Sequence, residues 1–168
     1  GRVDKARVIA EGEAAKGTRA AQRYLADLET FQSALAAGKG RLRLKDGPAA
    51  KKSLDRAWTV ADRLGGGAGR GKLKKPLADA LYLSAIAAKN LGNACDWGRD
   101  IQRAAQLDAR NRKVKQQLRA VQQKADSGLL KARSLVDDPG RAKRVAQEHL
   151  CYARPGSKTY RDLAAIAR

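Results

Sequence analysis

Three side chains in this sequence are of the types that most often bind metals or act as nucleophiles, namely Cys95, His149 and Cys151. His149 and Cys151 could share a metal ion, but a structural zinc takes four such ligands and the chain contains only these three Cys and His side chains. The histidine could serve as the base for a cysteine or serine nucleophile, yet no local pattern supports that pairing. We therefore expect no metal, no cofactor and no catalytic residue, with a buried thiol at Cys151 and a partly exposed imidazole.

The state of the two cysteines is open at this level, since they could be paired, free or buried. They are too few for a disulfide framework in a chain of 168 residues. The cysteines therefore do not identify the cellular compartment, and we expect the cytoplasm. The sequence begins at Gly1 without a Met, so we expect a fragment of a longer chain, and because it starts without a secretory leader we expect any targeting segment to be absent or already removed. Because no run of about 18 apolar residues is present, we expect a soluble protein without a membrane span.

A glycine-rich stretch at residues 65–71 carries a second chemical pattern. Gly66 and Gly71, followed by Lys72, have the spacing of a loop whose backbone N–H groups and lysine bind phosphates. Leu73 stands where Ser or Thr would contact the magnesium-linked oxygen, and a helix instead of an apolar strand is expected before the loop. A flexible connector between helices explains the glycines better, so we do not expect nucleotide binding.

Positive charge is the most pronounced feature of the composition. Lys and Arg number 36 against 17 Asp and Glu, which gives a formal charge of +19 and makes anionic partners plausible. The excess is densest in three loop-proximal patches, around residues 41–45, 70–75 and 110–119. The residues predicted to contact an anion or nucleic acid are Arg70, Lys72, Lys74, Lys75, Arg110, Arg112, Lys115 and Arg119. Solvated helix faces explain the same excess without any partner, because Lys and Arg are ordinary surface residues.

The remaining composition predicts an all-α fold. Ala, Leu and Val carry most of the apolar share, aromatic residues are 4%, and no run of β-branched residues alternates with polar ones. Gly, Pro and Asp punctuate the chain, and Asp137 and Asp138 before Pro139 predict a helix start. The helices are expected at about residues 3–16, 18–37, 48–64, 76–91, 94–107, 111–136, 139–153 and 157–168.

Residues 78–111 have the pattern of a tightly packed helical hairpin. Small residues such as Ala85 and Ala104 let two helices approach closely, Leu81 and Ile101 fill the seam, and Gly92 permits a tight reversal. This segment resembles one complete tetratricopeptide repeat (TPR) without a gap.

Looser resemblances to the same family cover most of the remaining chain. Residues 49–64 look like a second repeat helix paired with residues 23–37, and residues 138–168 look like a second helix followed by the opening of another repeat. Trp97 and Ala109 depart from the family, which has a small residue and a proline there. The resemblance implies one domain over residues 1–168, a TPR-like solenoid of stacked antiparallel hairpins with about seven to eight helices.

A TPR-like solenoid implies a concave groove that binds an extended peptide or a partner helix. On this register the groove is lined by Asp79, Tyr82, Ile86, Lys89, Lys113, Gln116, Gln117 and Lys124. By resemblance, basic residues in such grooves hold acidic segments or a terminal carboxylate, and Lys113 matches such a place. The expected function is a non-enzymatic protein-binding scaffold, with no small-molecule substrate evident.

The alternative function is a nucleic-acid-associated protein, such as a ribonucleoprotein component, whose basic loops contact phosphates. The positions of Trp58 and Trp97 argue against base stacking, because these residues are not spaced so that two aromatic rings would lie side by side.

Overall fold

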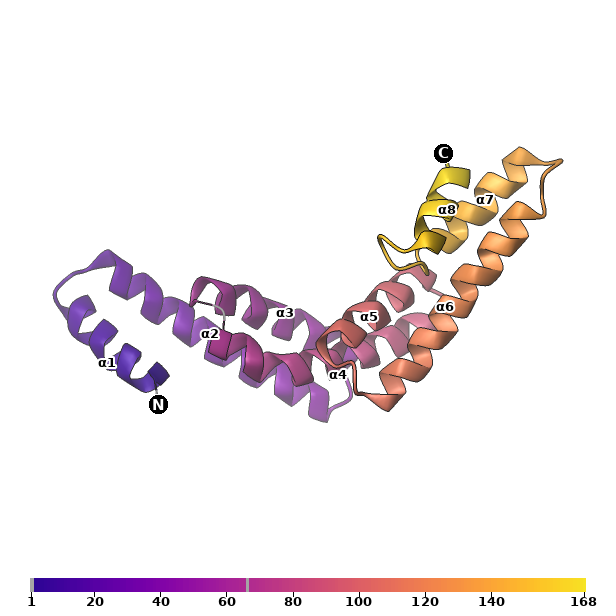
Figure 1. The fold of residues 1–168 in the computed structure, drawn as a ribbon. Helices are drawn as coiled ribbons and strands as arrows, with labels where there is room; N and C mark the ends of the chain where they lie inside the picture. The colour runs from indigo at the N-terminus through magenta and orange to yellow at the C-terminus, as the bar shows by residue number, and fades with distance from the viewer. Residues whose placement is uncertain (1, 66) are drawn as a thin grey trace. The chain divides into compact units, whose positions relative to one another are not determined.

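The computed structural model describes residues 2–65 and 67–168, and over these residues the chain is all-α, with eight helices and no strand (Figure 1). This confirms the predicted fold class. The helices are α1 (Arg2–Ala15), α2 (Arg19–Arg43), α3 (Gly47–Arg63), α4 (Gly67–Asn90), α5 (Ala94–Leu107), α6 (Arg112–Arg133), α7 (Pro139–Leu150) and α8 (Lys158–Ile166).

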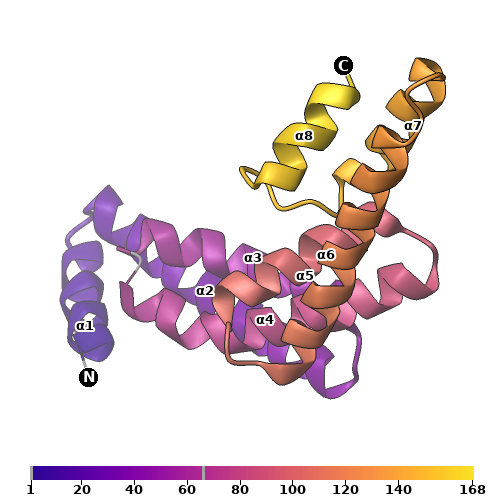
Figure 2. The same ribbon diagram turned by 45° about the vertical axis from the view of Figure 1, so that its right-hand side comes forward.

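The chain forms two compact units, Gly1–Ala80 and Leu81–Arg168, whose boundary falls within α4. In the first unit, α2 packs against α1 and α3. In the second unit, α6 packs against α5, α7 and α8, and α7 also packs against α8 (Figure 2). Consecutive helices therefore pack in pairs, as an array of helical hairpins requires. The prediction of one domain over residues 1–168 stays a prediction.

Side-chain caps begin several helices where the sequence predicts a start. Asp46 Oδ1 accepts a hydrogen bond from the Ala49 N–H at 3.1 Å, and Asp138 Oδ1 accepts one from the Arg141 N–H at 2.9 Å. A carboxylate or amide at this position satisfies N–H groups that the first helical turn leaves unpaired. The helix start predicted before Pro139 is confirmed.

Two helices are longer than predicted, because their glycines serve close packing instead of ending the helix. A Cβ atom on Gly38 would lie 2.5 Å from Leu54 Cγ, so α2 needs glycine there and continues to Arg43. The flexible connector predicted at residues 65–71 is wrong over residues 67–71, which are helical, and there a Cβ on Gly69 would lie 3.0 Å from Ala61 Cβ. Gly66, part of the phosphate-loop pattern, lies outside the described residues.

The predicted seam of the central hairpin is present. Leu81 and Ile101 are fully buried, and Gly92 has a φ of +72°, a backbone conformation that glycine adopts at little cost. Ala85, Trp97, Ile101 and Val121 form one apolar cluster that joins α4, α5 and α6. A second cluster joins α6, α7, α8 and the stretch between α7 and α8, and it consists of Ala125, Leu129, Ala132, Val145, Ala146, Ala153 and Leu163.

Across residues 2–65 and 67–168, no helix combines enough length with enough apolar character to cross a lipid bilayer.

Candidate functional site

Cys95 and Cys151 form a disulfide bond that joins the start of α5 to the end of α7, with their Cα atoms 4.8 Å apart. This bond decides the question that the sequence left open. Both cysteines are half-buried, so the expected buried thiol at Cys151 is wrong. The expected partly exposed imidazole is present at His149, whose Nδ1 lies 2.9 Å from the Val145 carbonyl oxygen.

The post-α7 segment, residues 151–157, lies against α5 beside this bond. A Cβ atom on Gly98 would lie 2.6 Å from the carbonyl oxygen of Cys151, so the two backbones meet with no room for a side chain. Gln102 Nε2 donates a hydrogen bond to the Tyr152 carbonyl oxygen at 2.9 Å. The Tyr152 ring also meets the Trp97 ring edge-on, with centroids 5.8 Å apart. The chain after α7 is thus held on α5 by a covalent bond and several contacts.

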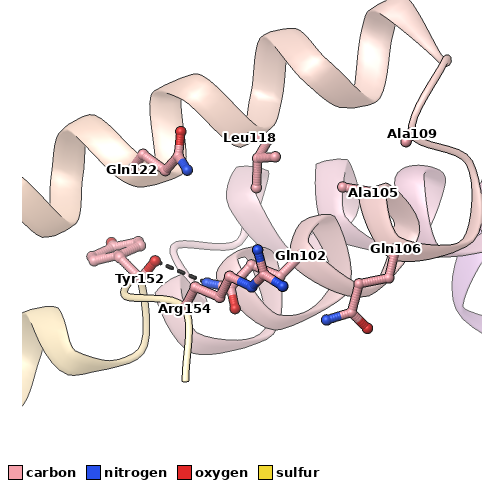
Figure 3. A pocket seen from close by; sticks show the side chains of 8 residues that line it. All are labelled: Gln102, Ala105, Gln106, Ala109, Leu118, Gln122, Tyr152 and Arg154. Carbon is pink, nitrogen blue, oxygen red and sulfur yellow. Dashed lines mark hydrogen bonds between the residues drawn. The ribbon is translucent and has the colours of Figure 1, made fainter. Parts of the chain in front are cut away.

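A pocket of about 340 Å³ lies between α5, α6 and the post-α7 segment. We call it the α5–α6 pocket, and its lining extends from Tyr152 at one end to Ala109 at the other (Figure 3). The lining residues are Gln102, Ala105, Gln106, Ala109, Leu118, Gln122, Tyr152 and Arg154. The pocket is therefore built from two helices and a segment that is about fifty residues away in sequence.

Four lining residues of the α5–α6 pocket are apolar or aromatic, and the other four can bind through hydrogen bonds and charge. Its three glutamine amides each carry both donors and acceptors, and Arg154 adds a permanent positive charge. The Arg154 side chain is exposed and forms no ion pair with any described residue. None of the lining residues is a carboxylate, thiol or imidazole. The pocket can hold a polar, negatively charged group.

Exposed cations flank the α6 side of this pocket. Lys115 is three residues before the pocket-lining Leu118, and Arg119 is three residues before Gln122, so these side chains share one side of the helix. Arg110 and Arg112 follow Ala109 in the chain, at the N-terminal end of α6, where the helix dipole adds positive potential. We call this set the basic edge, and its residues are Arg110, Arg112, Lys115 and Arg119.

All four side chains of the basic edge are exposed, and none forms an ion pair within the part of the chain that the structure describes. No acidic residue lies in the first turn of α6. Four of the residues predicted to contact an anion thus stand together beside the pocket with their charges uncompensated.

The other predicted anion-contact residues lie in the first unit. Arg70 is already engaged, since it donates a hydrogen bond to Asp62 and its guanidinium carbon lies 5.4 Å from the centre of the Trp58 ring. This hydrogen bond is the main cause that holds the pKa of Asp62 below its ordinary value. Three further lysines of this set are exposed on α4, namely Lys72, Lys74 and Lys75. Only Arg70 among these four is held by an ion pair in the described residues.

The α4 residues of the predicted groove have differing environments. Tyr82 packs against the cluster of Ala85 and Trp97, and the Lys89 ammonium lies 4.9 Å from the centre of the Trp97 ring. Ile86 is half-buried, and Asp79, also half-buried, belongs to the first unit. The aromatic member of the groove is thus engaged in packing.

The α6 residues of the predicted groove stand on the side of the helix away from Lys115 and Arg119. Lys113, Gln116 and Lys124 are exposed. Gln117 is half-buried, and its Oε1 atom is buried without a hydrogen-bond partner among the described residues. The groove and the α5–α6 pocket therefore use opposite edges of α6, so variants on this helix can separate them.

Sequence reasoning predicted none of the residues that line the pocket, although it named the four residues of the basic edge beside it. A signal for α5 was present, because Gln102, Ala105 and Gln106 recur at intervals of three and one residues, which is the spacing of one helix face, whereas Ala109 lies in the turn after α5. No local signal marks Arg154, because only the tertiary structure brings the post-α7 segment to α5.

No group of three or more His, Cys, Asp or Glu side chains converges on a metal position within residues 2–65 and 67–168. Comparison with protein-family models, with curated proteins and with solved structures finds no match for this chain. The resemblance to the TPR family accordingly stays a prediction.

Proposed function

We propose that this protein is a non-enzymatic scaffold that binds an acidic, extended segment of a partner protein in the α5–α6 pocket and along its basic edge. The single observation that carries this proposal is the group of uncompensated cations beside an amide-lined pocket. Opposite charge on a partner would steer its approach and set its orientation.

The form of the pocket favours a peptide segment over a compact ligand. Its lining is elongated from Tyr152 to Ala109, and the glutamine amides are spread along it (Figure 3). An extended peptide presents backbone N–H and C=O groups along its length, and amide side chains can pair with both. Arg154 would bind a carboxylate of the segment, in the two-pronged geometry that guanidinium groups favour.

Fluorescence anisotropy with a fluorescein-labelled hexaglutamate peptide tests the proposal. The double variant Lys115→Glu/Arg119→Glu should weaken binding at least about tenfold, which corresponds to about 1.4 kcal/mol. The matched control is Lys113→Glu/Lys124→Glu, which makes the same change in net charge on the opposite edge of the same helix and should retain most of the affinity. Circular dichroism of both variants checks that the helices are retained.

Equal weakening of peptide binding by both double variants would reject the pocket as the binding site, because binding would then depend on net charge alone. Loss confined to Lys113→Glu/Lys124→Glu would instead assign the peptide to the predicted groove. A further variant, Arg154→Ala, should also weaken binding about tenfold, since it removes a charged hydrogen-bond donor from the pocket.

Nucleic-acid binding is the second candidate, and the uncompensated charges of the basic edge favour it as well. The aromatic rings do not, because Trp97 is buried and Trp58 is half-buried next to Arg70. Phosphate contact would give a log affinity that falls with log salt at a slope near −0.9 per phosphate on duplex DNA. A salt series with a DNA duplex that yields fewer than about two contacts would reject this candidate.

A further inference from the structure

The Cys95–Cys151 disulfide lines a second cavity, of about 350 Å³, which shares the lining residue Gln102 with the α5–α6 pocket. Both cysteines are half-buried, so the bond is not sealed within a core. The remaining lining residues are Arg99, Gln102, Gln147, Leu150, Ala153, Pro155 and Tyr160. A small thiol can therefore approach the bond through this cavity.

The same bond supports the α5–α6 pocket. Cys151 is followed directly by Tyr152 and, two positions later, by Arg154, and both of these line that pocket. Gln102 lines both cavities and donates its hydrogen bond to the Tyr152 carbonyl oxygen. The placement of Arg154 in the pocket thus depends on how the post-α7 segment is attached to α5.

Besides the disulfide, several noncovalent contacts among the described residues attach this segment to α5. They include the Gln102 hydrogen bond, the packing of Tyr152 on Trp97 and its cluster, and the close approach at Gly98. Ala153 of this segment is a buried member of the apolar cluster that holds α7 and α8 on α6, and Arg133 pairs with Asp162 at 2.7 Å. Breaking the disulfide would therefore act on the segment's contact with α5 and leave Ala153 in its cluster with α6, α7 and α8.

We propose that the Cys95–Cys151 bond is a site of thiol–disulfide exchange with a dithiol reductant, and that its reduction releases the post-α7 segment from α5 and opens the α5–α6 pocket. The consequence for partner binding rests on the proposed function, whereas the exchange and the release do not. Disulfides persist in oxidising compartments and are reduced in the cytosol. The α5–α6 pocket would therefore be assembled in an oxidising compartment and open in the cytosol.

The exchange proceeds in two displacements. A thiolate of the dithiol attacks Cys151 Sγ, a mixed disulfide forms, and the protein S–S bond breaks with its electron pair leaving on Cys95 Sγ. The second thiolate of the reductant attacks its own sulfur in the mixed disulfide, which closes the reductant's disulfide and releases the Cys151 thiolate. Two electrons pass to the protein, and the two protons lost by the dithiol balance those taken up by the two cysteines.

The positions of the cysteines favour Cys95 as the leaving group. Cys95 lies in the first turn of α5, two residues after its cap Asn93, where the helix dipole stabilises a thiolate. Arg99 follows one turn later, although it also pairs with Asp96 at 3.4 Å. Cys151 ends α7, at the negative end of that helix, which disfavours a thiolate.

Treating the full chain with dithiothreitol tests the inference. Maleimide labelling followed by mass spectrometry should show two free thiols under native conditions. Hydrogen exchange at the Gln102 side-chain amide, which donates to the Tyr152 carbonyl oxygen, should accelerate at least tenfold, while exchange in α2 and α3 stays unchanged. Binding of the hexaglutamate peptide should weaken at least tenfold on reduction.

The variant Cys95→Ser/Cys151→Ser is the matched control. Without any reductant, its hydrogen-exchange rates should equal those of the reduced protein, and dithiothreitol should not alter these rates further. Resistance of the bond to dithiothreitol, unchanged hydrogen exchange at the Gln102 side-chain amide after reduction, or unfolding of the whole second unit would each overturn the inference. If the oxidised protein does not bind hexaglutamate, the proposed function fails. The maleimide labelling and the hydrogen-exchange rates then still decide whether reduction releases the segment.

Discussion

Replacing Gly98 with alanine should loosen the contact between α5 and the post-α7 segment. The added Cβ would lie 2.6 Å from the Cys151 carbonyl oxygen and 3.4 Å from the Tyr152 Cα atom. Both are backbone atoms, so no side-chain rotation relieves the overlap and the segment must shift. Overpacking of this kind costs about 1–3 kcal/mol.

Two further terms set the expected size of the effect. Alanine is a better helix former than glycine, which offsets about 1 kcal/mol of the cost. A shift of the segment also lengthens the 2.9 Å hydrogen bond between Gln102 and the Tyr152 carbonyl oxygen, which contributes about 1 kcal/mol. The free energy of unfolding of the second unit should therefore fall by about 2 kcal/mol, or by roughly 8–16 °C in Tm.

Tryptophan fluorescence during urea unfolding measures this change in a Trp58→Phe background. Trp97, which is 5% exposed and contacts Tyr152, then reports on the second unit alone. The matched control is Gly140→Ala in α7, where the added Cβ would meet Asp138 Oδ1 at 3.7 Å, an ordinary contact. That variant should be unchanged or more stable by up to about 1 kcal/mol.

A Gly98→Ala protein as stable as the parent, with Gly140→Ala behaving as expected, would refute this reasoning. It would mean that the segment can move away from α5 at no cost.

Two further predictions concern the first unit. The hydrogen bond from Arg70 holds the pKa of Asp62 below its ordinary value. The stabilisation of the folded unit by this pair is therefore present above the pKa of the unfolded carboxyl group, and it is lost as pH falls through the folded pKa. Arg70→Gln should therefore raise the pKa of Asp62 in a carboxyl NMR titration and flatten the acid loss of stability, and an unchanged titration would exclude the assigned cause. Gly38→Ala would place a Cβ 2.5 Å from the fully buried Leu54 and should destabilise α2 and α3 by about 1–3 kcal/mol in urea unfolding. Gly40→Ala, with no atom within 4 Å of its Cβ, is the matched control and should gain about 0.5–1 kcal/mol, so equal behaviour of the two variants would contradict the packing role of Gly38.

The sequence by itself determined the number and order of the helices and the central hairpin, but not the end of α2 or the start of α4. Caps such as Asp46 and Asp138 act on N–H groups three residues away, and the small residues of α4 and α5 recur at helical spacing. These signals lie within one or two helical turns, so they can be interpreted without knowing the rest of the fold. The buried Leu81 and Ile101 and the reversal at Gly92 followed from them.

Only the tertiary structure decided which glycines end a helix and which allow two helices to meet. Gly38 and Gly92 look alike in sequence, but Gly38 faces Leu54 inside α2 whereas Gly92 reverses the chain at a φ of +72°. The tertiary structure likewise decided that Cys95 and Cys151 pair, and that Arg154 joins Gln102 in one pocket. The physical reason is distance along the chain, because caps and helical periodicity act over a few residues, whereas these approaches depend on how whole helices pack.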